Sequence, residues 1–317
     1  MSGGASPVVV VGVPVWHGAT FVGETLRSVL AQDGVTLRLV ISVDGADEAS
    51  AGACEPFLRD DRVKLVIQPS RLGWVRNSAA VLAAAAAGAA HYACLQPHDD
   101  IMEETYLSSL LAVAEAAPQA AVVYSDIRAF GDLDVLIHQP SVIGSPLARL
   151  TILLIDHFNA VAFRGLTRVS ALRAVEPISG NPFDDFAADT VWMARLATVG
   201  DLICVPRSLY RKRYHAGNVH AEWNRWSRER QISAWTRHCL DMLAEALKLA
   251  KDAAARTMLV EATRIRLFQS GGTQLIFHRV MSALTAEERA RVFLEFDPAV
   301  AQLCRAKTDE PTRPSSS

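Results

Sequence analysis

Two adjacent carboxylates, Asp99 and Asp100, follow a short apolar segment, Tyr92–Leu95. A continuous apolar run of this length fits a buried strand, which would deliver both side chains to one edge of a sheet. Carboxylate oxygens are hard ligands that suit Mg²⁺ or Mn²⁺, and a diphosphate with water can complete the shell of such an ion. Asp99 and Asp100 are therefore candidates for a site that holds a diphosphate, with a helix cap or a solvated turn as the alternative reading.

The elements that must position these carboxylates alternate along the chain. Strand patterns cover Val8–Val13, Leu37–Val43, Val63–Ile67, Tyr92–Leu95 and Ala120–Tyr124. Helix patterns lie between them, over Ala19–Ala31, Glu48–Leu58, Val75–Ala89 and Glu103–Glu115. Repeated strand–helix units predict an α/β fold with a mainly parallel, buried sheet. Ligands of such a sheet bind beyond the carboxyl ends of its strands, so the loops that follow the first four strands should share one edge.

The second half of the chain has a different pattern. Regular periodicity is lost over Phe130–Pro146, where Gly and Pro suggest a looser, substrate-facing segment. It returns as a helix over Asp189–Thr198, which Asp189 can N-cap. A short strand, Leu202–Val205, then leads into Arg207–His215.

Four regions follow from these patterns: a disordered N-terminus at 1–6, an α/β domain at 7–226, a C-terminal helical region at 227–306 and a polar, disordered tail at 307–317. The helical region has a break at Gly271 and Gly272. Its amphipathic helices could form a homodimer interface, a lid or a membrane-docking face, and the pattern does not choose among them.

Composition places the chain among ordinary globular proteins. Half of the 317 residues are hydrophobic and the formal net charge is −2, so no overall field points to nucleic acid or another polyanion. The five cysteines are widely spaced without a C-x-x-C pair, which favours reduced thiols and a cytoplasmic location. No apolar segment is suited to span a bilayer, and peripheral contact with the inner face of the membrane stays open.

The order of the segments resembles family 2 glycosyltransferases, which are inverting enzymes with the GT-A fold. The resemblance covers roughly residues 7–220. The stretch VVVVGVPVWHGATFVGETLRSVL, at Val8–Leu30, is similar to the opening strand, loop and helix of the family. This likeness implies that Pro14, Val15 and Trp16 lie on the nucleotide side of the site.

Two further segments imply contacts with the nucleotide. VISVDGADE, at Val40–Glu48, resembles the D-D-G-S segment whose aspartate meets the base; Asp44 is the match, and Val43 stands in the place of the first aspartate. GWVRN, at Gly73–Asn77, resembles the G-x-x-x-A-R-N segment whose arginine lies near the diphosphate, so Arg76 is the match.

The segment that carries Asp99 and Asp100 also has a counterpart in the family. QPHDDIMEETYL, at Gln96–Leu107, resembles the D-x-D-D segment, so Asp99 matches the principal metal aspartate and Pro97 replaces the first one. LYRKRYHAGNV, at Leu209–Val219, is similar to the L-Y-R-Y-R-x-H-x-x-S stretch. That likeness implies that His215 binds the metal or the diphosphate.

The likeness of a last segment implies which residue is the general base. FAADTVWMARL, at Phe186–Leu196, resembles the E-D-x-x-L-x-x-R-L helix whose aspartate takes this role. Asp189 is the match, and Ala188 stands in the place of the glutamate. Asp184 and Asp185 are rival bases, because spacing alone does not exclude them.

Together these likenesses imply an inverting glycosyltransferase that uses a nucleoside-diphosphate sugar, with a UDP-sugar as the first expectation. The expected acceptor is a hydroxyl of a glycan or glycolipid. Mn²⁺ or Mg²⁺ on Asp99 and His215, with help from Arg76 and the basic stretch Arg211–Arg213, would neutralise the diphosphate.

Two other functions stay open at this point. Pro97 and Ala188 depart from the family pattern, which allows a catalytically impaired subunit that binds a sugar nucleotide. A sugar-1-phosphate nucleotidyltransferase shares the alternating fold and the metal carboxylates. It is disfavoured because Gly12–Gly18 contains no Arg or Lys.

Overall fold

The computed structural model describes residues 6–155, 160–268 and 280–306. The chain divides into two compact units, one built from residues 1–144 and 158–218 and the other from residues 145–157 and 219–317. The expectations for the first five residues, for a break at Gly271 and Gly272 and for the tail at 307–317 lie outside the described residues.

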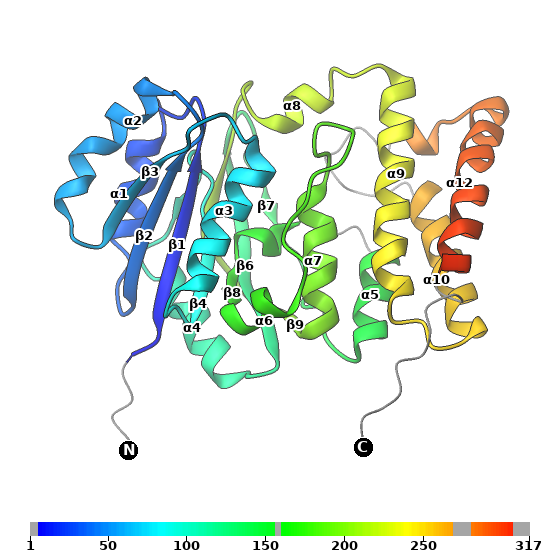
Figure 1. The fold of residues 1–317 in the computed structure, drawn as a ribbon, viewed down its shortest axis with the longest axis horizontal. Coiled ribbons are helices and arrows are strands. Elements are labelled where there is room, and N and C mark those ends of the chain that lie inside the picture. Colours follow the sequence, from blue (N-terminus) through cyan, green and yellow to red (C-terminus); the bar gives the residue numbers. More distant parts are fainter. Residues whose placement is uncertain (1–5, 156–159, 269–279, 307–317) are drawn as a thin grey trace. The chain divides into compact units, whose positions relative to one another are not determined.

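The first unit is built on a mixed, mostly parallel sheet (Figure 1), as the strand–helix alternation predicts. Its strands are β1 (Val8–Val15), β2 (Thr36–Val43), β3 (Val63–Ile67), β4 (Tyr92–Leu95), β5 (Ile101–Met102), β6 (Ala120–Gly131), β7 (Leu136–Ile137), β8 (Leu166–Arg168) and β9 (Asp201–Tyr214). The order across the sheet is β3-β2-β1-β4-β8-β6-β9-β5, and β7 pairs with β6. Strands β1 to β4 are parallel, and β8 is antiparallel to both of its neighbours.

Helices connect the strands of this unit. They are α1 (Val22–Leu30), α2 (Glu48–Cys54), α3 (Trp74–Ala87), α4 (Tyr106–Ala116), α6 (Val169–Ala174) and α7 (Ala188–Val199), with 3₁₀ turns at Glu55–Arg59 and Val161–Arg164. The β-branched side chains of β1 are buried at alternate positions from Val9 to Val15. Helix α3 packs closely on β1, since a Cβ at Gly12 would lie 2.8 Å from the Cβ of Val81. This contact fixes the central strand whose end leads to the predicted site.

Helix α2 and strand β6 differ in their bounds from the sequence-based expectation. The predicted helix Glu48–Leu58 is α-helical only as far as Cys54 and continues as a 3₁₀ turn, because Pro56 has no N–H to donate to an α-helical bond. Strand β6 extends from Tyr124 to Gly131, into the segment that we expected to be irregular. Its parallel pairing with β9 stabilises that extension.

The prediction that Asp189 caps its helix is wrong. Helix α7 begins at Ala188, and Ala187, with a left-handed φ of 51°, holds the N-cap position. Asp189 lies in the first turn, and its carboxylate accepts a bond from the amide N–H of Thr190 at 2.9 Å. The Asp189 side chain is therefore not needed to cap the helix.

The second unit is helical in its described residues. It contains α5 (Pro146–Ile155), α8 (Val219–Trp223), α9 (Arg228–Leu247), α10 (Ala253–Phe268) and α12 (Ala286–Ala306). The hydroxyl of Ser227 caps α9 by accepting from the amide of Arg230, and α9 packs against α5, α10 and α12. The C-terminal helical region is confirmed, while α5 falls in a stretch for which the sequence predicted no element. None of the helices in the described residues has the length and apolar character that crossing a membrane requires.

We predict that Gly131→Ala lowers the free energy of unfolding by about 1–3 kcal/mol. Gly131 has a φ of +90°, and an added Cβ would lie 2.4 Å from the carbonyl oxygen of Tyr214 in β9. Urea denaturation followed by circular dichroism measures the change. The matched control is Gly52→Ala in α2, where nothing lies within 4 Å and the helix should gain about 0.5–1 kcal/mol. Equal midpoints for the two variants would contradict the close β6–β9 approach.

Candidate active site

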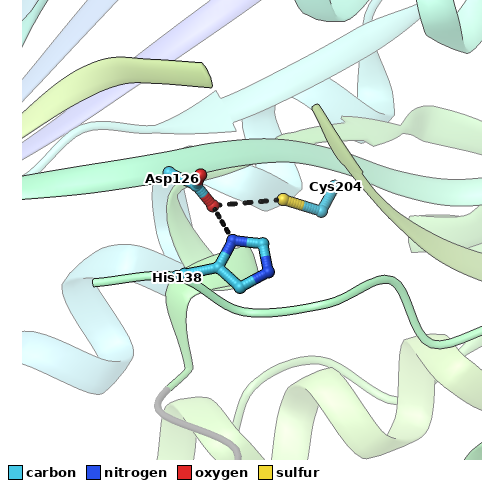
Figure 2. A group of neighbouring side chains, drawn as sticks. All are labelled: Asp126, His138 and Cys204. Atoms are coloured by element: carbon cyan, nitrogen blue, oxygen red, sulfur yellow. Dashed lines mark hydrogen bonds and ion pairs between the residues drawn. The ribbon is translucent and has the colours of Figure 1, made fainter. Parts of the chain in front are cut away.

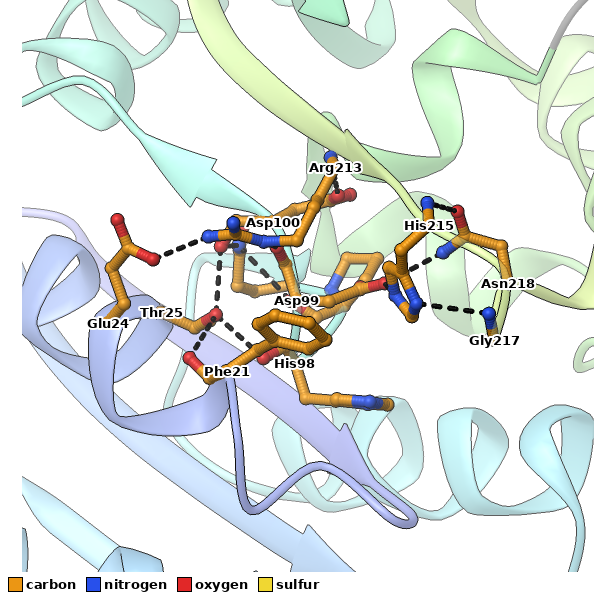
Figure 3. A network of polar contacts seen from close by, with 12 residues as sticks. Phe21, Glu24, Thr25, His98, Asp99, Asp100, Arg213, His215, Gly217 and Asn218 are labelled. Carbon is orange, nitrogen blue, oxygen red and sulfur yellow. Dashed lines mark hydrogen bonds and ion pairs between the residues drawn. The ribbon is translucent and has the colours of Figure 1, made fainter. Parts of the chain in front are cut away.

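The loop that carries Asp99 and Asp100 is tied to its surroundings by side-chain hydrogen bonds. The hydroxyl of Thr25 in α1 lies 2.7 Å from the carbonyl oxygen of His98 and 2.9 Å from that of Asp100. The amide side chain of Gln96 also donates to the Asp100 carbonyl, at 2.8 Å. Figure 3 shows α1 beside this loop. The backbone at the end of β4 is thus held in one conformation.

The same side of α1 continues these contacts along the chain. The hydroxyl of Ser28 accepts from the amide of Met102 at 3.2 Å. Just after α1, the amide side chain of Gln32 donates to the carbonyl of Glu103 at 2.7 Å and accepts from the amide of Leu107 at 2.8 Å. Thr25, Ser28 and Gln32 form a polar stripe, defined by these three residues, along the segment after Asp99.

The carboxylate of Asp99 meets the segment that follows β9. Its Oδ2 atom lies 3.0 Å from Nε2 of His215 and accepts from the side-chain amide of Asn218, also at 3.0 Å (Figure 3). The side chain of Asp99 is 13% exposed and that of His215 is 26% exposed, so both can still be reached by a ligand. The structure therefore brings together the two residues for which the family likeness implies a metal.

Asp100 has a different environment from its neighbour. It is buried, and its Oδ2 atom accepts from Nε of Arg164 at 2.8 Å and from the hydroxyl of Tyr210 at 3.1 Å. Its Oδ1 atom accepts from the backbone amide of Arg213 at 2.9 Å. Burial raises the pKa of Asp100, and the Arg164 guanidinium acts in the opposite direction. Hydrogen-bond donors of the protein thus occupy both oxygens of Asp100. Its role in binding the nucleotide-sugar stays a prediction, and these contacts do not support it.

Sequence reasoning missed Arg164, which lies at the end of the 3₁₀ turn before β8. Burial disfavours its charge, but Asp100, Tyr210 and Asp189 favour it and hold the pKa of Arg164 above its ordinary value. None of the family-like segments contains this residue, because it lies between Pro146 and Asp189, where the sequence predicts no element. Its role becomes visible only when β8 is placed between β4 and β6.

Asp189 lies within the electrostatic reach of the same arginine. Burial raises the pKa of Asp189, while the charges of Arg164 and Lys212 and the Thr190 amide lower it. The three carboxylates that competed for the role of base are therefore not equivalent. Asp185 accepts from the amide of Asn181 at 3.0 Å and closes the turn before α7, and Asp184 is exposed.

Lys212 adds a second cation from β9. Burial and the neighbouring Arg164 lower its pKa to about 8, although the carboxylates of Asp100, Asp189 and Asp99 oppose this shift. Arg164, Lys212 and these three carboxylates form one group of interacting charges, which we call the charge cluster. Perturbed pKa values in such a group are typical of functional sites.

Pro14, Val15, Trp16 and Asp44, which are predicted to contact the nucleotide, lie at the ends of β1 and β2. The side chain of Asp44 is buried and accepts from the amides of Leu72 and Gly73, at 2.6 and 2.9 Å. Arg76 is exposed in the first turn of α3, which directly follows this loop. Asp44 thus shapes the loop that leads to Arg76, and its contact with a base stays a prediction.

The end of β1 also reaches the Asp99 loop. The carbonyl oxygen of Pro14 lies 3.3 Å from Nδ1 of His98, and the amide of Asp44 donates to the carbonyl of Val15 at 2.9 Å. Trp16, the next residue, has the guanidinium of Arg71 4.5 Å from its ring centroid. Sequence reasoning missed Arg71, which follows β3 and shares no quoted motif. The predicted nucleotide and metal segments therefore meet at one edge of the sheet.

Comparison with known proteins identifies the family of the chain. The sequence profile described as Glycosyl transferase family 2 matches residues 10–173, which is 164 of the 317 residues. The chain belongs to this family. The family is confirmed, and with it the expectation of a glycosyltransferase that uses a nucleotide-linked sugar. No curated protein sequence matches the chain.

Solved structures resemble this glycosyltransferase in fold. S. aureus TarS 1–349 has a TM-score of 0.65 at 13% identity, over 93% of this chain and 80% of that one. Its complex with UDP-GlcNAc gives 0.66 at 14% identity, over 92% and 81%. The mannosyltransferase PcManGT from Pyrobaculum calidifontis, in complex with GDP-Man and Mn²⁺, gives 0.56 at 14% identity, over 96% and 88%. These likenesses confirm the GT-A-like fold.

We predict that Arg164→Met lowers the free energy of unfolding by about 3–5 kcal/mol, because it leaves the carboxylate of Asp100 buried without its cation. Urea denaturation measures the loss. The matched control is Arg128→Met, which breaks an exposed pair with Asp134 at 2.6 Å and should cost at most about 1 kcal/mol. Similar losses for the two variants would contradict a buried ion pair at Arg164.

The lowered pKa of Lys212 predicts that the free energy of unfolding depends on pH. Its pKa is about 8 in the folded protein against an ordinary value of 10.5, so between these values the unfolded chain binds more protons. The free energy of unfolding should therefore gain a positive slope with pH in this window, while below about pH 8 the cost of the buried charge is fully present.

Urea denaturation of wild type and Lys212→Met at pH 7.5, 8.5 and 9.5 checks this slope. Relative to the variant, the wild type should become more stable as the pH rises. A constant difference between the two proteins at the three pH values would contradict the lowered pKa.

Proposed function

We propose that this glycosyltransferase moves a sugar from a nucleoside-diphosphate sugar to an acceptor hydroxyl with inversion, and that Asp189 is the general base. The observation that carries the proposal is the charge cluster. In it, the charges of Arg164 and Lys212 act both on the carboxylate of Asp189 and on that of Asp100, beyond β4. An inverting displacement needs these two functions, a proton acceptor and a holder of the leaving diphosphate, in one site.

Asp99 and His215 suit a divalent cation at the diphosphate. A carboxylate oxygen and an imidazole nitrogen lie 3.0 Å apart, and both side chains are partly exposed. Because Pro97 supplies no ligand and Asp100 is taken by Arg164, the protein offers few ligands, which is compatible with a cation that diphosphate and water complete. When bound, Mn²⁺ or Mg²⁺ would neutralise charge on the leaving group. The complex of PcManGT with GDP-Man and Mn²⁺ supports this assignment.

Lys212 is a protein cation that we assign to the diphosphate, in addition to Arg76. Its lowered pKa reflects a poorly solvated ammonium, and a ligand with negative charge would favour its protonated form. Arg213 has a different role in this proposal. Its Nε atom donates to the carbonyl of Asp99 at 3.0 Å, and its Nη2 atom is paired with Glu24. Arg213 therefore holds the Asp99 loop, and Lys212 meets the phosphate.

Asp189 takes the proton of the acceptor hydroxyl as the hydroxyl oxygen attacks the anomeric carbon. The bond between that carbon and the diphosphate oxygen breaks in the same step, and the electron pair leaves with the nucleotide. Burial makes Asp189 a better proton acceptor than an ordinary carboxylate, and Arg164 keeps it ionised before the reaction. This pairing of opposed effects suits a base that must be charged and still reactive.

The nucleotide end of the proposal rests on the loops after β1, β2 and β3. We assign the nucleotide to the end of β1 at Pro14, Val15 and Trp16, where the side chain of Val15 is buried, with Arg76 toward the diphosphate. Asp44 contributes by fixing the amides of Leu72 and Gly73. A UDP-sugar is the first donor to test, since TarS was solved with UDP-GlcNAc. A glycan or glycolipid acceptor, peripheral membrane contact and a homodimer through the C-terminal helices stay part of the proposal.

We predict that Asp189→Asn lowers the rate of nucleotide release from the preferred donor by about 10²–10⁴-fold, because the variant has no proton acceptor. Donor affinity, measured by calorimetry, should stay within a few fold. Asp184→Asn is the matched control and should retain activity, since Asp184 is exposed. A fully active Asp189→Asn enzyme would exclude Asp189 as the base and move the role to Asp184 or Asp185.

We predict that Asp99→Asn weakens Mn²⁺-dependent binding of the nucleotide by at least about 10-fold, with little change in metal-free binding. The affinity for UDP-GlcNAc and GDP-mannose and the turnover of both are measured on purified protein, with and without Mn²⁺. Nucleotide binding without turnover by the wild type would favour the impaired subunit, and pyrophosphorolysis would favour a nucleotidyltransferase.

A further inference from the structure

A second group of side chains with metal-binding chemistry lies elsewhere in the first unit. Asp126 of β6, His138 just after β7 and Cys204 of β9 point toward one another (Figure 2). The Oδ1 atom of Asp126 lies 2.8 Å from Nδ1 of His138 and 3.5 Å from Sγ of Cys204. One atom from each of the three side chains lies within 4.8 Å of the other two. Three possible ligand atoms therefore converge without any rearrangement of the backbone.

The strands hold these three residues in place. Ile127 pairs with Ile137 in the antiparallel β6–β7 ladder, so Asp126 and His138 are the next opposed positions. On the other side of β6, the parallel register with β9 shifts at Asp126, next to the pairing of Tyr124 with Cys204. This irregularity in the ladder is the place where the carboxylate and the thiol meet. Register shifts of this kind re-aim side chains.

Neighbouring hydrogen bonds fix the connecting segment. The amide of Cys204 donates to the hydroxyl of Ser141 at 2.9 Å. The hydroxyl of Tyr124 donates to the carbonyl of Pro140 at 2.7 Å. The segment that follows His138 is therefore anchored to both strands, which keeps the imidazole beside the carboxylate.

The donor set indicates the class of cation. A thiol, an imidazole and a carboxylate together suit Zn²⁺ and related transition metals, whereas Mg²⁺ prefers oxygen ligands only. In a tetrahedral zinc site, bonds of about 2.0–2.3 Å place neighbouring ligand atoms about 3.3–3.5 Å apart. The sulfur–oxygen distance of 3.5 Å already fits, and the nitrogen–oxygen distance of 2.8 Å needs a small opening.

We infer that Asp126, His138 and Cys204 form a binding site for a zinc-class divalent metal, with water as the fourth ligand. The His138 side chain is 56% exposed, which gives the ion a path from solvent. Burial and the Asp126 carboxylate raise the pKa of the Cys204 thiol to about 12, so one proton leaves the thiol for each ion bound. The bound ion would cross-link β6, β7 and β9. Strand β9 then continues to Tyr210 and Lys212, so the site braces the strand that supplies the charge cluster.

Co²⁺ is the probe, because a bond between thiolate and Co²⁺ gives a near-ultraviolet charge-transfer band. We expect the full-length protein, reduced and metal-free, to develop this band with one equivalent of Co²⁺ and to lose it when Zn²⁺ is added. Cys204→Ser should abolish the band, and His138→Ala should weaken Zn²⁺ binding by at least about 10-fold. In the Asp99→Asn background, which removes a ligand of the other proposed cation site, Zn²⁺ should raise the melting temperature, and the added Cys204→Ser change should remove that rise.

Two variants serve as controls. Cys304→Ser removes another partly exposed thiol, from α12, and should keep the band. Asp99→Asn alters the proposed donor site and should also keep it. The inference is overturned if the wild type gives no band, if the band survives in Cys204→Ser, or if it disappears in Cys304→Ser or Asp99→Asn.

Discussion

The buried ion pair between Arg164 and Asp100 is the interaction on which the rest of the site depends. It joins the 3₁₀ turn before β8 to the loop after β4, and Tyr210 and the backbone of Arg213 bring β9 to the same carboxylate. Removing two charges from water is costly, and this cost is offset here because each oxygen of Asp100 accepts at least one bond. Since Asp100 is committed to these partners, Asp99 is the carboxylate of the pair that faces His215.

The charge cluster also explains how one site can hold groups whose pKa values shift in opposite directions. Burial raises the pKa of Asp189 and lowers that of Lys212, so each group resists its charge, while each stabilises the charge of the other. Arg164 keeps its charge throughout and biases both groups. A polyanionic donor entering such a site would shift this balance toward protonated Lys212.

The sequence supports different parts of this structure to different degrees. The alternation of β-branched and helical segments predicts strands β1 to β4 and their parallel direction, because local periodicity and a parallel sheet agree there. Motif order is enough to pair Asp99 with His215, although they are far apart in the chain. The likeness selects Asp99 for the metal, but it does not predict that Asp100 is buried against Arg164, because neighbours in sequence carry no information on which side chain turns inward. Arg164 and the continuation of β6 depend on long-range strand pairing, which a local pattern cannot show.

The polar stripe of Thr25, Ser28 and Gln32 has a mechanical consequence for the loop beside it. Apolar packing alone would let a helix slide by a fraction of an ångström at little cost, whereas hydrogen bonds weaken steeply when their angles change. Helix α1 therefore fixes the position of the backbone from His98 to Leu107. A displacement of the helix should move this segment, and a displacement of the segment should move the helix. Amide hydrogen exchange at Met102 and Leu107, whose N–H groups are held by this stripe, would report the rigidity of the Asp99 loop without any ligand present.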